Sequence, residues 1–292
     1  MSRFVFLLGT GRCGSSLVHE VLARHADVGT LKNVEDRLGR VGLGAAGDRL
    51  YRALPPATAA KGRLRLAPSE GYRVLADRVS PALAAPVRDL VADDATPWLA
   101  RRTREFFEGC AADHGSEVFL HKFTGWPRAG FLEAVWDDAV FVHVVRDGRA
   151  VASSLLQMPW WRGWAGPAGW TFGPLPAPYE REWLDAGRSF VTLAGLEWKV
   201  LLDAFTQARA ASRGGRWLEL RYEDVVDDPR AAFGRVLEHC GLARTPAFDR
   251  ELARHRISAG RTDAFRRDLG PDHVRRLDAS LGDHLRAHGY LP

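Results

Sequence analysis

The feature that most constrains the fold is an apolar run leading directly into a glycine-rich turn. Residues 4–22 read FVFLLGTGRCGSSLVHEVL. The apolar residues 4–8 predict a buried strand, and apolar residues at helical spacing predict a helix over 15–25. Backbone N–H groups and the positive end of the helix both point into such a turn, which therefore binds anions. The chain thus begins with an anion-binding β-loop-α unit.

A second unit of the same kind follows at residue 139. Residues 139–145 (AVFVHVV) predict a strand, 146–148 (RDG) a turn and 149–158 a helix. Two β-loop-α units imply parallel strands side by side. We therefore expect an α/β fold, P-loop-like, with a central parallel sheet flanked by helices.

The remaining segments vary in the strength of their signal. Residues 159–183, rich in Pro, Gly and Trp, predict a long loop, and residues 39–97 give the weakest signal and leave room for a lid. Without an internal repeat or a linker, residues 1–292 are interpreted as one domain. Further helices are predicted near 98–112, 188–209, 230–240 and 271–288, and short strands near 117–121 and 216–221.

Composition limits the classes of partner. Lys and Arg number 41 against 36 Asp and Glu, and the excess is spread along the chain without a basic block. This argues against nucleic acid and favours a small anion. The three cysteines lie far apart without a Cys-x-x-Cys pair, which argues against a disulfide framework or a structural zinc site. We expect a cytoplasmic location.

Membrane and export signals are weak. The first apolar run is shorter than the roughly 7–15 residues of a signal-peptide core and leads into Gly-Thr-Gly-Arg rather than a cleavage site. No stretch approaches the roughly 18 apolar residues of a membrane span. We therefore expect no membrane span.

The glycine loop fits two familiar phosphate-binding patterns only in part. Gly9, Gly11 and Gly14 match the dinucleotide fingerprint, with an acidic residue about 20 positions on. That pattern leaves Arg12 and the serines of the loop without a role. The spacing of Gly9 and Gly14 also fits a nucleotide-kinase loop, but Ser15 stands where lysine is required. The kinase pattern also lacks a strand ending in a magnesium-binding acid.

The second unit favours a different ligand. Arg146 lies at the carboxyl end of a strand and Ser154 stands eight residues later in the helix, so that both can meet one phosphate. Ser153 points roughly 100° away and is expected in solvent. Two phosphate sites on separate turns suit a nucleotide phosphorylated at two positions.

These motifs resemble the sulfotransferase family, in particular its tyrosylprotein and bacterial branch. The family motifs G-x-x-R-S/T-G-S/T-S/T and R-D-G/P-R-x-x-x-x-S both occur here almost unchanged, although Cys13 replaces a hydroxyl residue. The segments HKFTGWPR and LRYEDVVDDPRAAFGRVLEHCGL also resemble the family. The resemblance covers most of the chain and is weakest between residues 38 and 115.

The resemblance implies a donor, a product and a set of donor-binding residues. The donor is 3′-phosphoadenosine 5′-phosphosulfate (PAPS), its product is 3′,5′-adenosine bisphosphate (PAP), and no metal is required. The expected donor-binding residues are Gly11, Arg12, Cys13, Gly14, Ser15, Ser16, Arg146, Ser154, Tyr222 and Arg261.

Transfer of a sulfuryl group needs cations at the leaving side and a base for the acceptor hydroxyl. Arg12 and Lys122, the latter placed after the strand near 117–121, are the predicted cations. Glu35 corresponds to the acid that follows the first helix in the family and is the predicted base. Asp36 and His121 are its alternatives.

The acceptor is expected to be a small molecule or a carbohydrate. Trp160, Trp161, Trp164, Trp170 and Trp183 crowd one segment, and aromatic faces suit sugar rings and flat or lipid-like compounds. A nucleotide kinase and a non-catalytic nucleotide-binding protein are the alternative functions.

Overall fold

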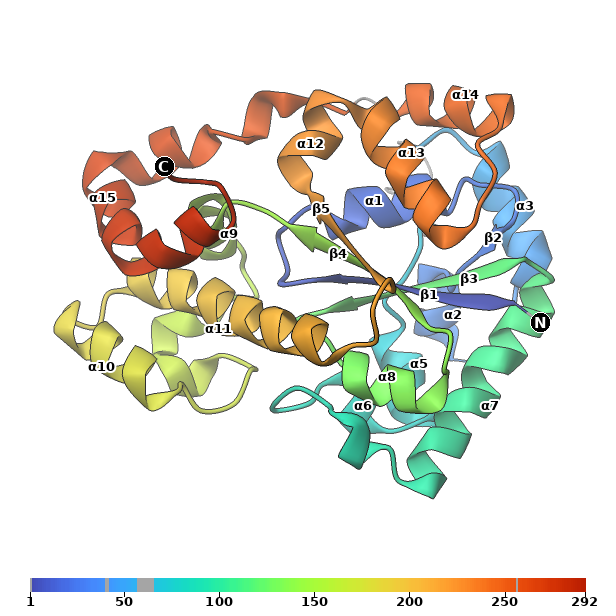
Figure 1. Ribbon diagram of the computed structural model, residues 1–292, viewed down its shortest axis with the longest axis horizontal. Helices are drawn as coiled ribbons and strands as arrows, with labels where there is room; N and C mark the ends of the chain where they lie inside the picture. Colours follow the sequence, from blue (N-terminus) through green and yellow to red (C-terminus); the bar gives the residue numbers. More distant parts are fainter. Residues whose placement is uncertain (1, 40–41, 57–65, 256) are drawn as a thin grey trace.

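The centre of the computed structural model is a parallel sheet. The structure describes residues 2–39, 42–56, 66–255 and 257–292. Five strands pair in the order β2-β3-β1-β4-β5, all in parallel (Figure 1). The predicted α/β fold with a central parallel sheet is confirmed. The strands are β1 (Arg3–Gly9), β2 (Val28–Gly29), β3 (Val118–Thr124), β4 (Val140–Val145) and β5 (Trp217–Arg221).

The first strand lies in the middle of the sheet because its side chains are apolar on both faces. Phe4, Phe6 and Leu8 pack into a core rich in aromatic rings, whereas Val5 and Leu7 pack into an aliphatic core on the opposite face. Each face of the sheet is therefore covered by helices (Figure 1).

Helices from different parts of the chain cover the two faces. The aromatic face packs against α5 (Tyr72–Arg78), α6 (Pro81–Ala84), α7 (Pro97–His114) and α8 (Ala129–Val135). The aliphatic face packs against α1 (Ser15–Leu22), α12 (Tyr222–Asp227), α13 (Pro229–Cys240) and α14 (Pro246–Arg254).

A third group of helices packs beside β4. It contains α9 (Gly148–Leu156), α11 (Phe190–Ala211) and α15 (Ala264–Ala287), the last with non-helical backbone at Gly270. A Cβ atom on Gly148 would lie 2.5 Å from the ring of Trp198, so glycine in the RDG turn lets α9 approach α11 closely. This contact fixes the position of the start of α9 against α11.

Some elements differ from the sequence prediction. The predicted loop at 159–183 contains two short 3-10 turns (Gly163–Ala165 and Pro167–Gly169) and α10 (Ala177–Asp185), whose first turn begins after a proline. The weak segment holds α3 (Gly44–Ala53) besides α5 and α6, and α2 (Asn33–Leu38) precedes it. Part of the predicted lid, residues 57–65, lies outside the described residues. Among the helices that the structure describes, none is both long and apolar enough to cross a membrane.

Candidate donor and acceptor site

The glycine loop turns sharply between β1 and α1. Gly11, Arg12 and Gly14 have positive φ angles of 88°, 53° and 92°. A Cβ atom on Gly14 would lie 2.2 Å from the ring of Tyr222, so this ring packs directly on the loop backbone. Both Gly11 and Gly14 therefore serve the backbone geometry that forms the predicted anion site.

The N-terminus of α1 directs backbone N–H groups toward the cavity. Among the described residues, no acceptor takes the backbone N–H groups of Ser15 and Ser16. Cys13 behaves differently, because its side chain is fully buried in the aliphatic core against Gly9. The structure therefore places the Cys13 thiol in the core, and the Cys13 side chain does not line the cavity.

Arg146 connects the two predicted phosphate turns. Its guanidinium donates to the carbonyl of Arg12 (3.1 Å) and to the carbonyl of Arg261 (2.9 Å), and lies 4.5 Å from the ring centroid of Tyr222. The Nε atom of Arg146 is buried and has no hydrogen-bond partner in the described part of the chain. Residues that were predicted from separate motifs to bind the nucleotide thus meet around the guanidinium of Arg146.

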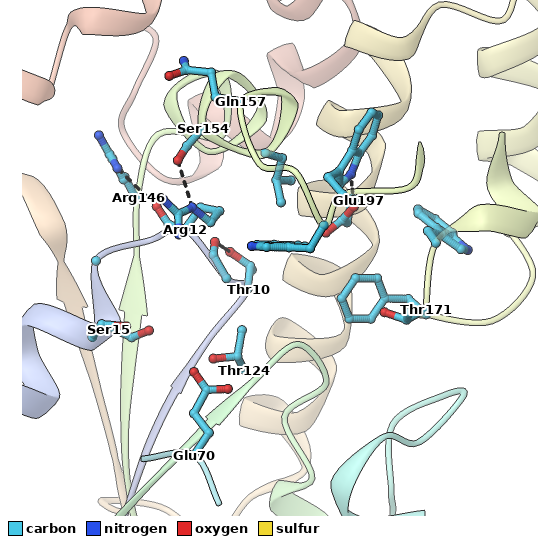
Figure 2. Close-up of a pocket in the computed structure, with 18 of the residues that line it drawn as sticks. Thr10, Arg12, Ser15, Glu70, Thr124, Arg146, Ser154, Gln157, Thr171 and Glu197 are labelled. Atoms are coloured by element: carbon cyan, nitrogen blue, oxygen red, sulfur yellow. Dashed lines mark hydrogen bonds between the residues drawn. The ribbon is translucent and has the colours of Figure 1, made fainter. Parts of the chain in front are cut away.

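A side-chain hydrogen bond also joins the glycine loop to helix α9. Arg12 Nε donates to Ser154 Oγ at 2.9 Å (Figure 2). Ser153 was expected in solvent, but it is buried and also lines the cavity, because α11 and α15 enclose α9 on its other sides.

Three arginines lie close together where the glycine loop meets Arg146. Within the described residues, Arg12, Arg146 and Arg261 form no ion pair with an acid. Burial and the nearby guanidinium of Arg146 lower the pKa of Arg12. Unpaired cations held this close together favour the binding of an anion.

Lys122 lies inside β3 rather than after it. The strand extends to Thr124, three residues beyond the predicted end, and carries Lys122 to the carboxyl edge of the sheet. Its Nζ atom donates to Ser16 Oγ and forms an ion pair with Glu70 Oε1, both at 2.7 Å. The ammonium group therefore sits directly beside the glycine loop.

Glu70 is an acidic residue of the cavity that no sequence motif predicts. It precedes α5, is partly exposed and lies near Thr124 at the lower wall of the cavity in Figure 2. It belongs to the segment with the weakest pattern. Its proximity to Lys122 arises from long-range packing, and no local motif marks it.

Glu35 is placed elsewhere, which corrects the expectation that it faces the reacting groups. Its carboxylate accepts from the backbone N–H group of Lys32 (2.7 Å) at the start of α2 and from that of Leu43 (2.9 Å) at the start of α3. It lines a separate cavity of about 510 Å³. Asp36 accepts from the Val74 N–H at 3.0 Å and lines a polar side cavity of about 380 Å³.

His121 is also removed from the candidate bases. Its ring is fully buried among the rings of Phe107 and Phe123, and neither ring nitrogen has a partner in the described residues. Burial lowers the pKa of His121 to about 3. A neutral ring without access to the cavity cannot take a proton from an acceptor.

The site opens into one cavity of about 690 Å³. Its donor side is basic, whereas its far side is aromatic and carries the carboxylate of Glu197 (Figure 2). Of the five predicted tryptophans, Trp164 and Trp183 do not line it. The aromatic lining residues are Tyr72, Trp126, Trp160, Trp161, Trp170, Phe172, Tyr222 and Phe265.

A metal site is not evident in the described ranges. They contain no group of three or more His, Cys, Asp or Glu side chains arranged to hold a metal ion.

A sequence profile of the sulfotransferase family matches residues 5–246. The chain belongs to the sulfotransferase family. No protein with a curated description matches it.

Solved structures of sulfotransferases share the fold of this family member. Sulfotransferase STF9 from Mycobacterium avium is 18% identical with a TM-score of 0.57, covering 98% of this chain and 76% of that one. The sulfotransferase domain of the curacin biosynthetic pathway is 13% identical with a TM-score of 0.51, covering 97% and 98%. The sulfotransferase domain of the Synechococcus PCC 7002 olefin synthase is 18% identical with a TM-score of 0.50, covering 96% and 95%.

Proposed function

We propose that this sulfotransferase moves the sulfuryl group of PAPS to a hydroxyl group of a small-molecule or carbohydrate acceptor. The observation that carries the proposal is the junction at Arg146. This side chain links the glycine loop, the β4–α9 turn and the segment at Arg261 around one cavity. A nucleotide with phosphate groups at both its 3′ and 5′ positions matches such a double anion site.

Each end of the donor has its own set of groups. The N–H groups of Ser15 and Ser16 and the ammonium of Lys122 suit the 5′-phosphosulfate. Arg146, Ser154 and Arg261 suit the 3′-phosphate, because the two arginines have no acidic partner among the described residues and Ser154 offers a hydroxyl. Arg12 lies between the two sets and contacts Ser154.

The transfer step then follows from charge placement. Lys122 and Arg12 stabilise the negative charge that develops on the bridging phosphate oxygen as its bond to sulfur breaks. Glu70 takes the proton of the acceptor hydroxyl while the hydroxyl oxygen bonds to sulfur, and PAP departs. In the free protein Glu70 is ion-paired with Lys122, so the proposed base lies directly beside the proposed cation.

Calorimetry with nucleotides tests the donor. In the absence of magnesium we expect PAP to bind at least about 10-fold more tightly than 5′-AMP, since the 3′-phosphate adds charge-assisted hydrogen bonds. Ser154→Ala and Arg146→Ala should reduce this ratio, whereas Arg213→Ala, on an exposed residue paired with Asp137, should not. Tighter binding of Mg-ATP or NAD than of PAP, or equal binding of PAP and 5′-AMP, would contradict the proposal.

Incubation with labelled PAPS and a metabolite extract tests catalysis separately. Transfer of label to a compound in the extract identifies the acceptor. If PAP binds but no label moves in any extract or to any hydroxyl compound, the protein is a nucleotide-binding protein without transferase activity.

A further inference from the structure

Glu197 is a buried carboxylate on the acceptor side of the cavity. It projects from α11, is 4% exposed and lines the cavity opposite the donor groups (Figure 2). Its Oε2 atom accepts a hydrogen bond from Trp161 Nε1 at 2.9 Å. In the described part of the chain Oε1 accepts no hydrogen bond, and the carboxylate has no Lys, Arg or His partner within ion-pair distance.

The unpartnered oxygen opens to the cavity. Although Oε1 has no hydrogen-bond partner among the described residues, it is not fully enclosed by protein atoms. It is therefore accessible from the cavity that Glu197 lines. Holding the Trp161 indole needs one acceptor atom, which an uncharged side chain would supply equally well. A carboxylate with a second oxygen open to a ligand cavity exceeds that structural need.

A carboxylate in this position is costly without a cation. Burial raises the pKa of Glu197 to about 7, and the hydrogen bond from Trp161 opposes the rise. A buried charge is stabilised when a partner of opposite charge reaches it. The protein supplies no such partner from its described residues, which leaves that role to a ligand.

The walls beside Glu197 are aromatic. Trp160 and Trp161 line the cavity, and a Cβ atom on Gly163 would lie 2.0 Å from the Trp161 ring, so the backbone fixes this indole from one side. Trp170 and Phe172 also line the cavity and pack edge to face, with centroids 6.2 Å apart. Aromatic faces around a carboxylate are suited to an organic ammonium group on an apolar body.

We propose that Glu197 is a specificity-determining residue that binds a protonated amino group of the acceptor. The acceptor class is then an amino alcohol, or a phenol that carries an aliphatic amine, with an apolar body. This inference rests on the proposed sulfotransferase function. The basic donor side repels an ammonium group, so the acceptor lies with its amine at Glu197 and its hydroxyl toward Glu70 and Lys122.

Matched ligand pairs test this orientation. The protein is saturated with PAP, and two pairs that differ only in the amino group are titrated by calorimetry: tyramine against 4-ethylphenol, and 6-aminohexan-1-ol against hexan-1-ol. We expect the amine of at least one pair to bind about 10-fold or more tightly than its partner. Glu197→Gln, which keeps an acceptor for Trp161, should remove the preference, whereas Glu180→Gln on the exposed face of α10 should keep it.

Several results would overturn the inference. These are equal affinity within both pairs in the unmodified protein, an unchanged amine preference in Glu197→Gln, or no binding of any of the four compounds. If Glu197→Gln does not fold, the comparison of pairs in the unmodified protein still decides. Failure of PAP to bind in the preceding saturation step would instead contradict the proposed function.

Discussion

The donor side and the acceptor side of the cavity are built in different ways. The donor side comes mainly from two contiguous motifs, one after β1 and one after β4, which are neighbouring strands of the sheet. The acceptor side is assembled from Glu70, the loop at 159–176 and Glu197 on α11, which are far apart in the sequence. Short motifs at strand ends can be recognised in the sequence, whereas residues brought together by tertiary packing leave no such pattern.

The largest expected effect separates two glutamates that compete for one role. Glu70→Gln should lower kcat about 10²- to 10⁴-fold with PAP affinity retained, because a general base is lost. Glu35→Gln should leave kcat nearly unchanged and lower the free energy of unfolding by about 1 kcal/mol, since one of its two backbone partners is lost.

Steady-state kinetics on the acceptor found by the labelling screen, together with thermal unfolding, measures both variants. The reverse pattern, with kcat lost only in Glu35→Gln, would return the base to the position predicted from the sequence.

A second test addresses the donor loop. Gly14→Ala should lower the free energy of unfolding by about 2–5 kcal/mol, because alanine is strained at a φ of 92° and its Cβ atom would collide with Tyr222. PAP affinity should fall as well. Gly109→Ala is the control, since a Cβ atom there meets nothing within 4 Å beyond its chain neighbours and the backbone of its own helix. Denaturant unfolding that gives equal stability for both variants would show that the loop tolerates a side chain.

The smallest expected effect concerns the acceptor side and depends on pH. The pKa of Glu197 is raised to about 7 in the folded protein, so the folded state holds a proton that the unfolded state releases above its ordinary pKa. This contribution is complete at low pH and is lost as pH rises toward and through 7. Glu197→Gln should therefore be more stable than the unmodified protein by about 1–3 kcal/mol at pH 8, and the difference should shrink at pH 5.

Unfolding midpoints recorded from pH 5 to pH 8 measure this difference. A gap between the two proteins that stays constant across the range would contradict a titrating carboxyl group at position 197. Glu180→Gln, an exposed change on α10, should track the unmodified protein throughout.

That the residues of the two motifs gather at one cavity was predictable, because local spacing determines it. Arg146 and Ser154 share one turn and one helix, so their separation along the chain places them near one point. Lys122 also lines this cavity, although the strand predicted to end before it continues to Thr124. Cys13 illustrates the limit, because a loop position does not reveal whether its side chain points to the ligand or to the core.

Three of the tryptophans predicted for the acceptor side line the cavity, but the carboxylates of that side could not be predicted, for a physical reason. Glu35 is the third residue of α2, a position where a carboxylate often binds free backbone N–H groups. This position indicates a helix-capping role, whereas the family resemblance indicates a base. Glu70 lies in a segment without periodicity, and Glu197 belongs to a helix that is buried along most of its length. Which of its buried residues faces a cavity depends on the neighbouring loop.

The grip of Arg146 on two carbonyls has a bearing on how natural variants should be interpreted. The same guanidinium holds the main chain at Arg12 and at Arg261, segments near opposite ends of the sequence. A substitution that displaces the segment before α15 would move the Arg146 guanidinium and thereby disturb the glycine loop at Arg12. Such a change would present as weakened nucleotide affinity even though the altered residue never touches the nucleotide.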